Sequence, residues 1–541
     1  MNKPFAITLD VGSSLANRTG SWRTVKPVYV NRLPPCNAKC PAGEKCRDWL
    51  FHAESGHYED AWRTIIEDNP FPATMGRVCY HTCEGACNRA DLDESVGINA
   101  VERFLGDHAL EKGWAFPKPE TSSGRRVLVV GSGPAGLSAA YHLARLGHAV
   151  HVVEAAPQSG GMMRYGIPRY RLPREILDKE VARIEALGVT IEYNREVTDL
   201  AEEMKAGGYD AVFLAVGASQ ARNAYIPAGD ASHILDAVSV LRSMEGEEPP
   251  MLGRRVVVYG GGNTAIDVAR TARRLGAEPV VVYRRTRDRA PAHAFEIEEA
   301  LEEGVSMKWL STIAQAEKGE IRIEKMKLDE SGYPQPTGEY ETVEADTVVL
   351  ALGQQSNLSF LEKIEGLEID RDVLKVDENF ATGVPGIYAG GDMVPGDRNV
   401  TAAIGHGKRA ARAIDAFLKG EVYKAPEPAA PATYARLNTW YYSDAPKTVR
   451  PQLDLIRRQT TFDEVVEGLT EENALFEARR CMSCGNCLQC DNCYGVCPDN
   501  AVIKTGDDKV PYIFNYDYCK GCGICAHECP CGAIDMVSED I

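Results

Sequence analysis

The placement of the cysteines constrains this chain more than any other feature of its sequence. The 541 residues include 17 cysteines, in three groups at 36–87, 481–497 and 519–531. No cysteine lies between Cys87 and Cys481. A disulfide framework would not leave so long a gap, and the chain is much longer than the secreted scaffolds that depend on disulfides. Grouped thiolates of this kind indicate metal binding.

The two C-terminal groups repeat one spacing. Each contains the run C-x2-C-x2-C-x3-C-P, the pattern of bacterial two-cluster ferredoxins, in which the fourth thiolate reaches the other cluster. Zinc also binds four cysteines, but its sites usually pair two C-x2-C units, so the doubled run favours iron–sulfur clusters. The predicted [4Fe–4S] ligands are Cys487, Cys490, Cys493 and Cys529 for one cluster, and Cys519, Cys522, Cys525 and Cys497 for the other.

Three cysteines of the tail lie outside this doubled pattern. Cys481 and Cys484 could ligate a further cluster, or they could be free thiols beside the first one. We expect Cys531 not to be a ligand. Because iron–sulfur clusters carry single electrons, the chain also needs an electron source, and the upstream sequence contains candidates for it.

Residues 125–155 have the pattern of a dinucleotide-binding βαβ unit. The buried strand VLVV precedes a G-x-G-x-x-G turn that opens a helix. Such glycines let the backbone approach a pyrophosphate at the helix N-terminus, and an acid at the end of the next strand binds a ribose hydroxyl. The predicted cofactor contacts in this unit are Gly131, Gly133, Pro134, Ala135, Gly136 and Glu154.

A second βαβ unit spans residues 254–286. Its second strand ends on Arg284 and Arg285 rather than on an acid. Arginine at this position accommodates the 2′-phosphate of NADP, whereas an acid favours NAD, so the pattern favours NADP(H). The two arginines could also be solvated surface charge, and NAD(H) stays open. The other predicted contacts of this turn are Gly260, Gly261, Gly262, Asn263 and Thr264.

A third stretch, GIYAGGDMVPGDRNVTAAIGHGKRAARAI, indicates which unit holds flavin. In two-dinucleotide-binding flavoproteins such a segment returns to the first domain, where its Asp contacts the ribityl and phosphate part of FAD. The chain order is therefore FAD half, NAD(P)H domain, FAD half. Further predicted cofactor contacts are Gly161, Met162, Gly217, Gly353, Gly391, Asp392, Val400 and Thr401.

The motifs GSGPAGL, GGMMRYGIPRYRLP, GGGNTAIDVARTARRLGA, YRRT and AGGD carry a family resemblance. Over residues 36–417 the chain resembles the small (beta) subunit of glutamate synthase and its relatives, which include the N-terminal part of dihydropyrimidine dehydrogenase. The resemblance implies FAD, NAD(P)H and flavin-mediated hydride transfer, which requires no catalytic nucleophile or general base.

The resemblance also implies a helical N-terminal domain, which in relatives holds two [4Fe–4S] clusters. The relatives' pattern begins with C-x2-C-x4-C ahead of C-x3-C-P, and this chain lacks the first two cysteines. Too few remain for two all-cysteine clusters, so we expect at least one cluster, with structural zinc as the alternative. The matching cysteines are Cys36, Cys40, Cys79, Cys83 and Cys87.

The ligand set of this N-terminal cluster stays open. We expect Cys40, Cys79 and Cys83 with either Cys36 or Cys87. Cys46 lies outside the pattern but could restore a missing ligand. In dihydropyrimidine dehydrogenase one cluster has a non-cysteine ligand, and the residue at that place here is Glu102 or Arg103.

The predicted fold class is multidomain α/β, with two Rossmann-like domains between a helical iron–sulfur domain and an α+β bacterial-ferredoxin domain. The net charge of −18 argues against nucleic acid as a partner. With no long apolar run and no secretory signal, we expect a cytoplasmic protein without membrane insertion. The predicted parts are 1–120 (helical iron–sulfur), 121–250 and 346–420 (FAD), 251–345 (NAD(P)H), 421–480 (linker and docking segment) and 481–541 (ferredoxin).

These features predict an NAD(P)H:acceptor oxidoreductase. Flavin accepts a hydride and releases single electrons, so it belongs between nicotinamide and the clusters. The expected acceptor is ferredoxin or a larger redox complex, such as a 2-oxoacid oxidoreductase or a sulfite reductase, whose flavoproteins carry a similar tail. A glutamate synthase small subunit and a non-catalytic electron-wiring subunit are the alternatives. The sequence leaves homodimer and hetero-oligomer open.

Overall fold

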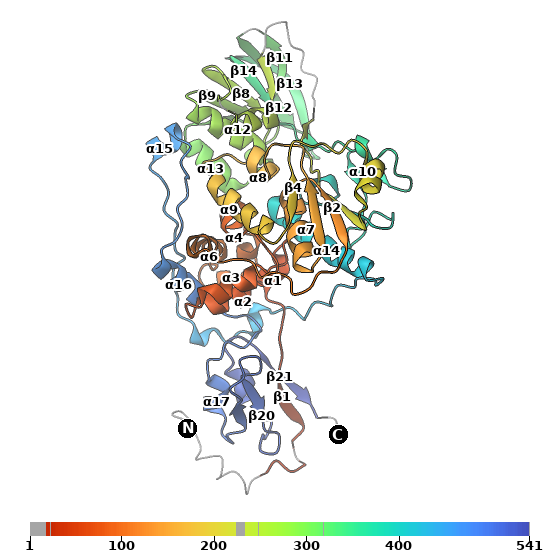
Figure 1. Ribbon diagram of the computed structural model, residues 1–541. Helices are drawn as coiled ribbons and strands as arrows, with labels where there is room; N and C mark the ends of the chain where they lie inside the picture. The colour runs from red at the N-terminus through yellow and green to blue at the C-terminus, as the bar shows by residue number, and fades with distance from the viewer. Residues whose placement is uncertain (1–17, 22, 223–232, 247, 318, 540–541) are drawn as a thin grey trace.

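The computed structural model describes residues 18–21, 23–222, 233–246, 248–317 and 319–539. The expectation that the chain has no secretory signal concerns residues 1–17, which lie outside the described part. Within it, no helix has the length and apolar character that crossing a membrane requires. Figure 1 shows a central body with a sheet-containing unit at one end and a small unit, holding the last part of the chain, at the other.

The N-terminal region is helical and packs on the first nucleotide-binding unit. Trp49, Trp62 and Leu105 are fully buried in it. Its helix α4 begins where the carboxylate of Glu180, from α9, accepts hydrogen bonds from two backbone N–H groups, each 2.9 Å long. A carboxylate at a helix N-terminus stabilises the helix, so the two units are joined here. The helices are α1 (Pro35–Lys39), α2 (Cys46–Ala53), α3 (Tyr58–Ile65), α4 (Pro72–Val78), α5 (Thr82–Gly85), α6 (Ile98–Lys112) and α9 (Arg174–Glu185).

The first nucleotide-binding unit is a parallel sheet with the order β18-β5-β2-β3-β4. Its central strands are continuous apolar runs, as expected for strands covered on both faces. Helices α7 and α14 pack against each other and against this sheet. The elements are β2 (Arg126–Val130), α7 (Pro134–Arg145), β3 (Ala149–Val153), β4 (Thr190–Glu192), α10 (Leu200–Gly207), β5 (Ala211–Leu214), β18 (Ile387–Ala389) and α14 (Val400–Leu418).

The second unit is a parallel sheet with the order β10-β9-β8-β14-β7. A three-stranded antiparallel sheet, β11-β12-β13, packs its apolar face on one side of it. The elements are β7 (His233–Asp236), α11 (Ala237–Ser243), β8 (Arg255–Tyr259), α12 (Asn263–Arg274), β9 (Glu278–Val282), α13 (Ala294–Glu302), β10 (Ser306–Lys308), β11 (Ser311–Glu317), β12 (Glu320–Leu328), β13 (Pro334–Glu344) and β14 (Thr347–Leu350).

This topology corrects two of the predicted boundaries. Strand β7 falls in the segment predicted as the first FAD half, and β14 falls in the second FAD half, yet both pair within the second sheet. The chain crosses between the units at the antiparallel pair β6 (Gln220–Ala221) and β15 (Gln354–Gln355). The boundaries therefore lie near these two strands, because a parallel sheet needs both flanking strands to bury its apolar centre.

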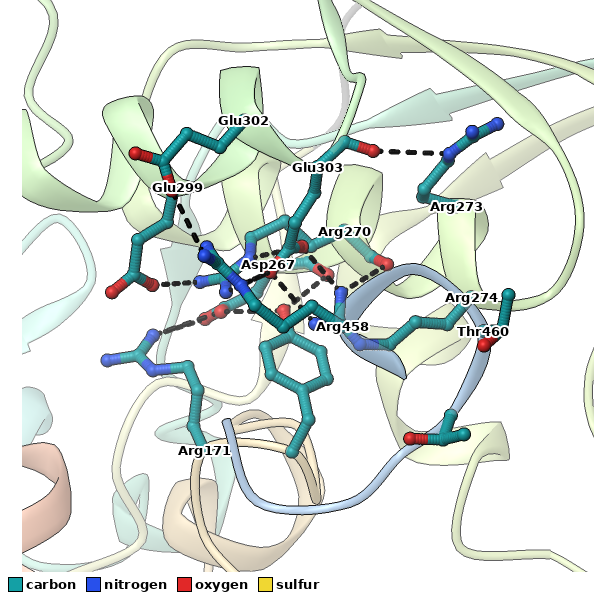
Figure 2. Close-up of polar contacts among 12 residues, drawn as sticks. Arg171, Asp267, Arg270, Arg273, Arg274, Glu299, Glu302, Glu303, Arg458 and Thr460 are labelled. Atoms are coloured by element: carbon teal, nitrogen blue, oxygen red, sulfur yellow. Dashed lines mark hydrogen bonds and ion pairs between the residues drawn. The ribbon is translucent and has the colours of Figure 1, made fainter. Parts of the chain in front are cut away.

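A buried ion-pair network holds the second unit against the first (Figure 2). Glu303, fully buried, accepts hydrogen bonds from Arg270 and Arg274 of α12, and Arg458 reaches it from α15 (Leu455–Thr460). Burial alone would raise the pKa of Glu303, but the hydrogen bonds from these arginines lower it to about 2. Arg171, from the first unit, pairs with Asp267 of α12 at 2.9 Å. Three segments distant in sequence thus meet at one set of charges, defined here as the charge junction.

The C-terminal region folds into a small α+β unit that also takes a strand from the N-terminus. Strand β1 (Val25–Tyr29) pairs antiparallel with β21 (Ile534–Ser538), and Figure 1 shows the two side by side. The prediction that residues 1–120 are all part of the helical domain is therefore wrong for β1. The edge of β21 would otherwise be unpaired. Helix α16 (Glu471–Arg479) precedes this unit and packs on α6 and α2 of the helical region. The other elements of the unit are α17 (Asn492–Val496), β19 (Val502–Lys504), β20 (Tyr512–Phe514) and α18 (Ile524–His527).

Candidate functional site

The first glycine-rich turn lies between β2 and α7 and is shaped for close backbone packing. Gly131 has φ +100°, and a Cβ there would lie 2.5 Å from the carbonyl oxygen of Ala215. A Cβ on Gly136 would lie 1.9 Å from the carbonyl oxygen of Gly131. Gly133 is the N-cap of α7, which begins at Pro134 and has no side-chain cap. The turn therefore leaves the first N–H groups of α7 for a phosphate.

Glu154, at the end of β3, stands beside this turn. Its Oε2 accepts hydrogen bonds from the backbone N–H and the hydroxyl of Ser132, at 2.7 and 2.6 Å, and its Oε1 accepts from the N–H of Ala156 at 2.8 Å. These bonds fix the carboxylate next to the turn, where it was predicted to meet a ribose. Gly161, which directly precedes α8 (Met162–Tyr165), approaches Gly133 so closely that a Cβ would lie 2.8 Å from its Cα.

The returning segment meets the first turn at Gly391 and Asp392. A Cβ on Gly391 would lie 3.1 Å from the Cβ of Ala135. Burial raises the pKa of Asp392, and the charge of Arg398 opposes that rise. Within the described residues, no hydrogen-bond donor is paired with the Asp392 carboxylate. A mostly buried carboxylate without a donor, beside an open glycine turn, fits a ligand that brings its own hydroxyl groups.

Val400 and Thr401, both predicted to contact FAD, are the first two residues of helix α14. Asn399 caps it, its Oδ1 accepting from the N–H of Ala402 at 2.8 Å. The hydroxyl of Thr401 is 3.3 Å from Sγ of Cys79, to which it donates. The side chain of Thr401 therefore serves the N-terminal cysteines, and only its backbone remains for a cofactor. The remaining predicted glycines lie at the ends of strands, Gly217 after β5 and Gly353 before β15.

The second glycine-rich turn lies between β8 and α12 and leads to two unpaired arginines. Arg284 is exposed and Arg285 is half-buried. Among the described residues neither guanidinium has an ion-pair partner, and Nε of Arg285 is buried without a hydrogen-bond acceptor. Thr264, at the start of α12, accepts a long hydrogen bond from Gln354 at 3.5 Å. Unpaired guanidinium groups at the end of β9 fit an anionic group of the nucleotide.

Asn263 joins this turn to the helical region. Its Nδ2 donates to the hydroxyl of Tyr80 at 2.6 Å, and its Oδ1 accepts from the N–H of His293 at 3.1 Å. The rings of Tyr80 and His293 stack with their centroids 3.8 Å apart. Tyr80 directly follows Cys79, so the nucleotide turn and a candidate cluster ligand are connected through two residues. Sequence reasoning missed this contact because nothing in the pattern marks Tyr80.

The tail cysteines surround two small pockets. Tyr29 places its hydroxyl 3.2 Å from Sγ of Cys493, and Cys531 lies with its Sγ 3.7 Å from that of Cys529. Backbone N–H groups also donate to cysteine sulfurs, as from Ala501 to Cys497 at 3.2 Å. One pocket is lined by Cys487, Cys490, Cys493, Cys529 and Cys531, and the other by Cys497, Cys519, Cys522 and Cys525. The structure thus brings each predicted ligand set together.

Most of the N-terminal cysteines lie close to one another. Hydrogen bonds with the thiols of Cys36, Cys40 and Cys83 raise the pKa of Cys46 well above its usual value, so these four sulfurs lie within reach of one another. Burial raises the pKa of Cys79, and the nearby Glu102 carboxylate and Cys83 thiol raise it further.

Of the two non-cysteine candidates, only Glu102 lies among these sulfurs. It is buried, and its Oε1 accepts from Asn69 at 3.1 Å. Burial raises the pKa of Glu102, and nearby acidic groups, including the Cys40 and Cys83 thiols, add to the rise. Arg103 instead pairs with Glu464 at 2.9 Å.

A third pocket joins the helical region to the tail. Its thiols come from Cys36, Cys87, Cys481 and Cys484. Within the described residues, no three His, Cys, Asp or Glu side chains converge closely enough to hold a single metal ion. The thiols instead surround small pockets, which fits a polyatomic cluster ligated by cysteine.

Comparison with known proteins decides the family. A model of the family pyridine nucleotide-disulphide oxidoreductase matches residues 125–407, which is more than half of the chain. The chain belongs to this family. Models of dihydropyrimidine dehydrogenase domain II with its 4Fe-4S cluster, and of a 4Fe-4S binding domain, match residues 30–114 and 512–535. No cysteine lies in residues 125–407, so this oxidoreductase has no redox disulfide there.

Several relatives of this oxidoreductase are subunits of redox enzymes. The NADP(+)-dependent formate dehydrogenase subunit beta of Moorella thermoacetica is 36% identical over 85% of this chain and 71% of its own. The NADPH-Fe(3+) oxidoreductase subunit beta of Geobacter sulfurreducens is 32% identical over 85% of this chain and 77% of its own. The glutamate synthase [NADPH] small chain of Escherichia coli is 33% identical over 71% and 89%.

These matches confirm the predicted fold class, cofactors and enzyme class. The protein is an FAD-dependent NAD(P)H oxidoreductase that also carries [4Fe–4S] clusters, and it transfers electrons between a nicotinamide nucleotide and iron–sulfur centres. Flavin supplies the exchange between a hydride and single electrons. The residues that hold each cofactor, and the acceptor, belong to the proposals below.

Proposed function

We propose that the chain is the nucleotide-oxidising subunit of a larger redox complex, with the reverse direction equally open. It passes electrons from NAD(P)H through FAD and a series of [4Fe–4S] clusters to a protein partner at the ferredoxin tail. The observation that carries the proposal is the continuity of the candidate sites. The nucleotide turn contacts Tyr80, the flavin-side helix contacts Cys79, and the thiol groups follow one another from there to the tail.

The flavin would lie in the first unit. The turn at Gly131–Gly136 would take the pyrophosphate on the N-terminus of α7, and Glu154 would orient the ribose. Asp392 has no donor among the described residues, and a hydroxyl of the flavin side chain would supply one. Met162 would form part of an apolar wall that excludes water from the isoalloxazine.

The nucleotide would lie on the second turn, with Arg284 and Arg285 on the 2′-phosphate of NADP(H). Their lack of carboxylate partners in the described residues supports this assignment over surface charge. If the assignment is right, Arg285→Ala raises the Kd of NADPH at least tenfold and leaves that of NADH within about twofold. Equal effects on both nucleotides would contradict it.

Three of the sets of cysteines described above would each ligate one cluster. In the tail, the two sets are those that line the two tail pockets, without Cys531. In the helical region, Cys40, Cys79 and Cys83 would hold one cluster, and either Cys46 or Glu102 would be its fourth ligand. Comparing Cys46→Ser with Glu102→Gln separates the last two choices, because only loss of the true ligand changes the electron paramagnetic resonance (EPR) spectrum of that cluster.

The proposed partner is another subunit of the redox complex. The relatives from Moorella and Geobacter cover more of the chain than the glutamate synthase small chain does, which favours a formate dehydrogenase-like or metal-reducing assembly over an aminating one. The acceptor would dock at the tail, where Ile503 of β19, Ile513 of β20 and Val510 between these strands are exposed.

Anaerobic purification from the native cell tests both levels of the proposal. The isolated chain should reduce benzyl viologen with NADPH, and a co-purifying oxidoreductase subunit should receive the same electrons. A yellow and brown protein that neither nucleotide reduces would overturn the proposal in favour of a non-catalytic wiring subunit. Co-purification with a glutamine amidotransferase subunit would establish the glutamate synthase alternative.

A further inference from the structure

Two thiols of the tail face two thiols of the helical region. Cys481 and Cys484 come from the segment after α16, whereas Cys36 lies in α1 and Cys87 follows α5. All four line one pocket, together with apolar residues such as Leu50 and Val96. The pairs are almost 400 residues apart in sequence, and neither pair alone has enough ligands for a cluster.

From this arrangement we infer that Cys36, Cys87, Cys481 and Cys484 together hold a further [4Fe–4S] cluster, which links the helical domain to the ferredoxin tail. Binding releases one proton from each thiol, and the four thiolates complete the coordination of the four irons. The inference deepens the proposed function, because this cluster would be the step between the helical domain and the tail.

The chain holds the two halves of this pocket in place. Arg47, from α2, donates to the hydroxyl of Ser483 at 2.7 Å and to the carbonyl of Cys487 at 2.6 Å. Arg89 donates to the carbonyl of Arg480 at 2.8 Å. These bonds come from the helical region and end on the residues that flank Cys481 and Cys484.

The backbone and amide groups around the sulfurs are also arranged for cluster ligation. The N–H of Ser483 points to Sγ of Cys481 at 3.4 Å. Asn88 contacts the Cys484 thiol with its side chain, and the N–H groups of Arg89 and Val96 point to the Cys87 sulfur. Hydrogen bonds to ligand sulfurs are a feature of iron–sulfur sites, where they stabilise the thiolate and tune the potential.

The position of the pocket fits a relay. Cys36 lines this pocket and also contacts Cys46, which lies beside Cys40 and Cys83. On the other side, Tyr442 lies near Cys481 and Cys484 and also near Cys490 and Cys531 of the tail pocket. A cluster here would have a neighbour on each side, whereas free thiols would leave a gap in the series.

Iron counting on the whole purified protein tests the inference. Cys87→Ser and Cys484→Ser should each lose about four irons per chain, one cluster. The double variant should also lose about four, because both residues serve one cluster. Cys531→Ser, a buried tail cysteine outside every proposed set, is the matched control and should keep its iron. An unchanged iron content in Cys484→Ser, a loss of about eight irons in the double variant, or one zinc per chain would each overturn the inference.

A second variant covers the case in which Cys484→Ser does not fold. Cys484→Asp offers a carboxylate ligand, so it should retain iron and change the EPR signal of one reduced cluster. A wild-type spectrum in this variant would overturn the inference. In all variants NADPH should still bleach the flavin, since the nucleotide and FAD sites are intact. Loss of that bleaching in the wild-type protein would count against the proposed function instead.

Discussion

Two junctions hold this chain together, and they use different chemistry. At the charge junction, arginines from α12 and α15 surround the buried Glu303, and Arg171 reaches Asp267 from the first unit. At the pocket of Cys36, Cys87, Cys481 and Cys484, thiols from both ends of the chain meet. Charges fix the nucleotide unit through the fold alone, whereas the proposed cluster would join the two halves of the thiol pocket. The charge junction therefore forms when the chain folds, whereas the thiol junction would also need assembly of its cofactor.

The largest difference should appear when iron is removed. Anaerobic oxidation with a chelator strips the clusters, so we expect the thiol junction to open and the charge junction to stay closed. Limited proteolysis should then cut within residues 421–535, while the segment 125–407 remains resistant. Equal protection of the tail before and after chelation would show that the bonds from Arg47 and Arg89 suffice without a cluster.

The charge junction should break when its central carboxylate is removed. Glu303→Ala leaves Arg270, Arg274 and Arg458 buried together without their shared partner. Loss of one side of a buried pair costs about 3–5 kcal/mol, so the Tm of the nucleotide unit should fall by many degrees in calorimetry. Glu302→Gln is the control, because this side chain is 60% exposed and, among the described residues, pairs with Arg458 only, so it should cost less than about 1 kcal/mol.

Acid should weaken the charge junction in the same way as the Glu303 variant, with a defined pH range. The folded pKa of Glu303 is about 2, below its ordinary value of 4.5. Its contribution is therefore complete above about pH 4.5 and is lost as the pH falls toward 2, a loss of roughly 3 kcal/mol. Denaturant unfolding between pH 6 and pH 3 should show this slope in the wild type and a shallower slope in Glu303→Gln. Identical slopes would contradict the assignment.

The smallest expected effect lies in the tail. Tyr29→Phe removes the hydroxyl 3.2 Å from the Cys493 sulfur. One hydrogen bond is worth about 0.5–1.5 kcal/mol, so the reduction potential of that cluster should fall by roughly 20–60 mV in an EPR-monitored titration. Tyr516→Phe, whose hydroxyl donates to the carbonyl of Pro27, should leave it within about 10 mV, the scatter of such a titration. A shift of the same size in both variants would mean that packing, not the bond, sets the potential.

Motifs that are local in sequence could be predicted, and contacts between distant segments could not. The doubled cysteine run and the two glycine-rich units each lie within about 45 residues, and the fold class and cofactors inferred from them are confirmed. The ligand residues stay predictions. The thiol pocket was missed as a set because its halves lie at opposite ends of the chain. One signal was available, since Cys481 and Cys484 have the C-x2-C spacing of the two cysteines missing near Cys36.

The charge junction left no sequence signal at all. Most of its charged residues belong to helices with ordinary polar patterns, and only the packing of α12, α13 and α15 makes Glu303, which directly follows α13, a buried anion. The two misplaced sheet boundaries have a similar cause. β7 and β14 are short strands that would suit either sheet, and the pairing of β14 with β8 and of β7 with β14 assigns them. In both cases the contacts with distant segments decide the structure, and the local sequence pattern does not.

The pairing of β1 with β21 has a consequence for how the protein is made. Arg23 and Glu539, which form an ion pair across these strands, are 516 residues apart. At about 5–20 residues per second, a ribosome needs roughly 25 to 100 s to pass from one to the other. For that time the nascent chain carries β1 without its partner strand, so the small C-terminal unit can complete its fold only after β21 has been synthesised.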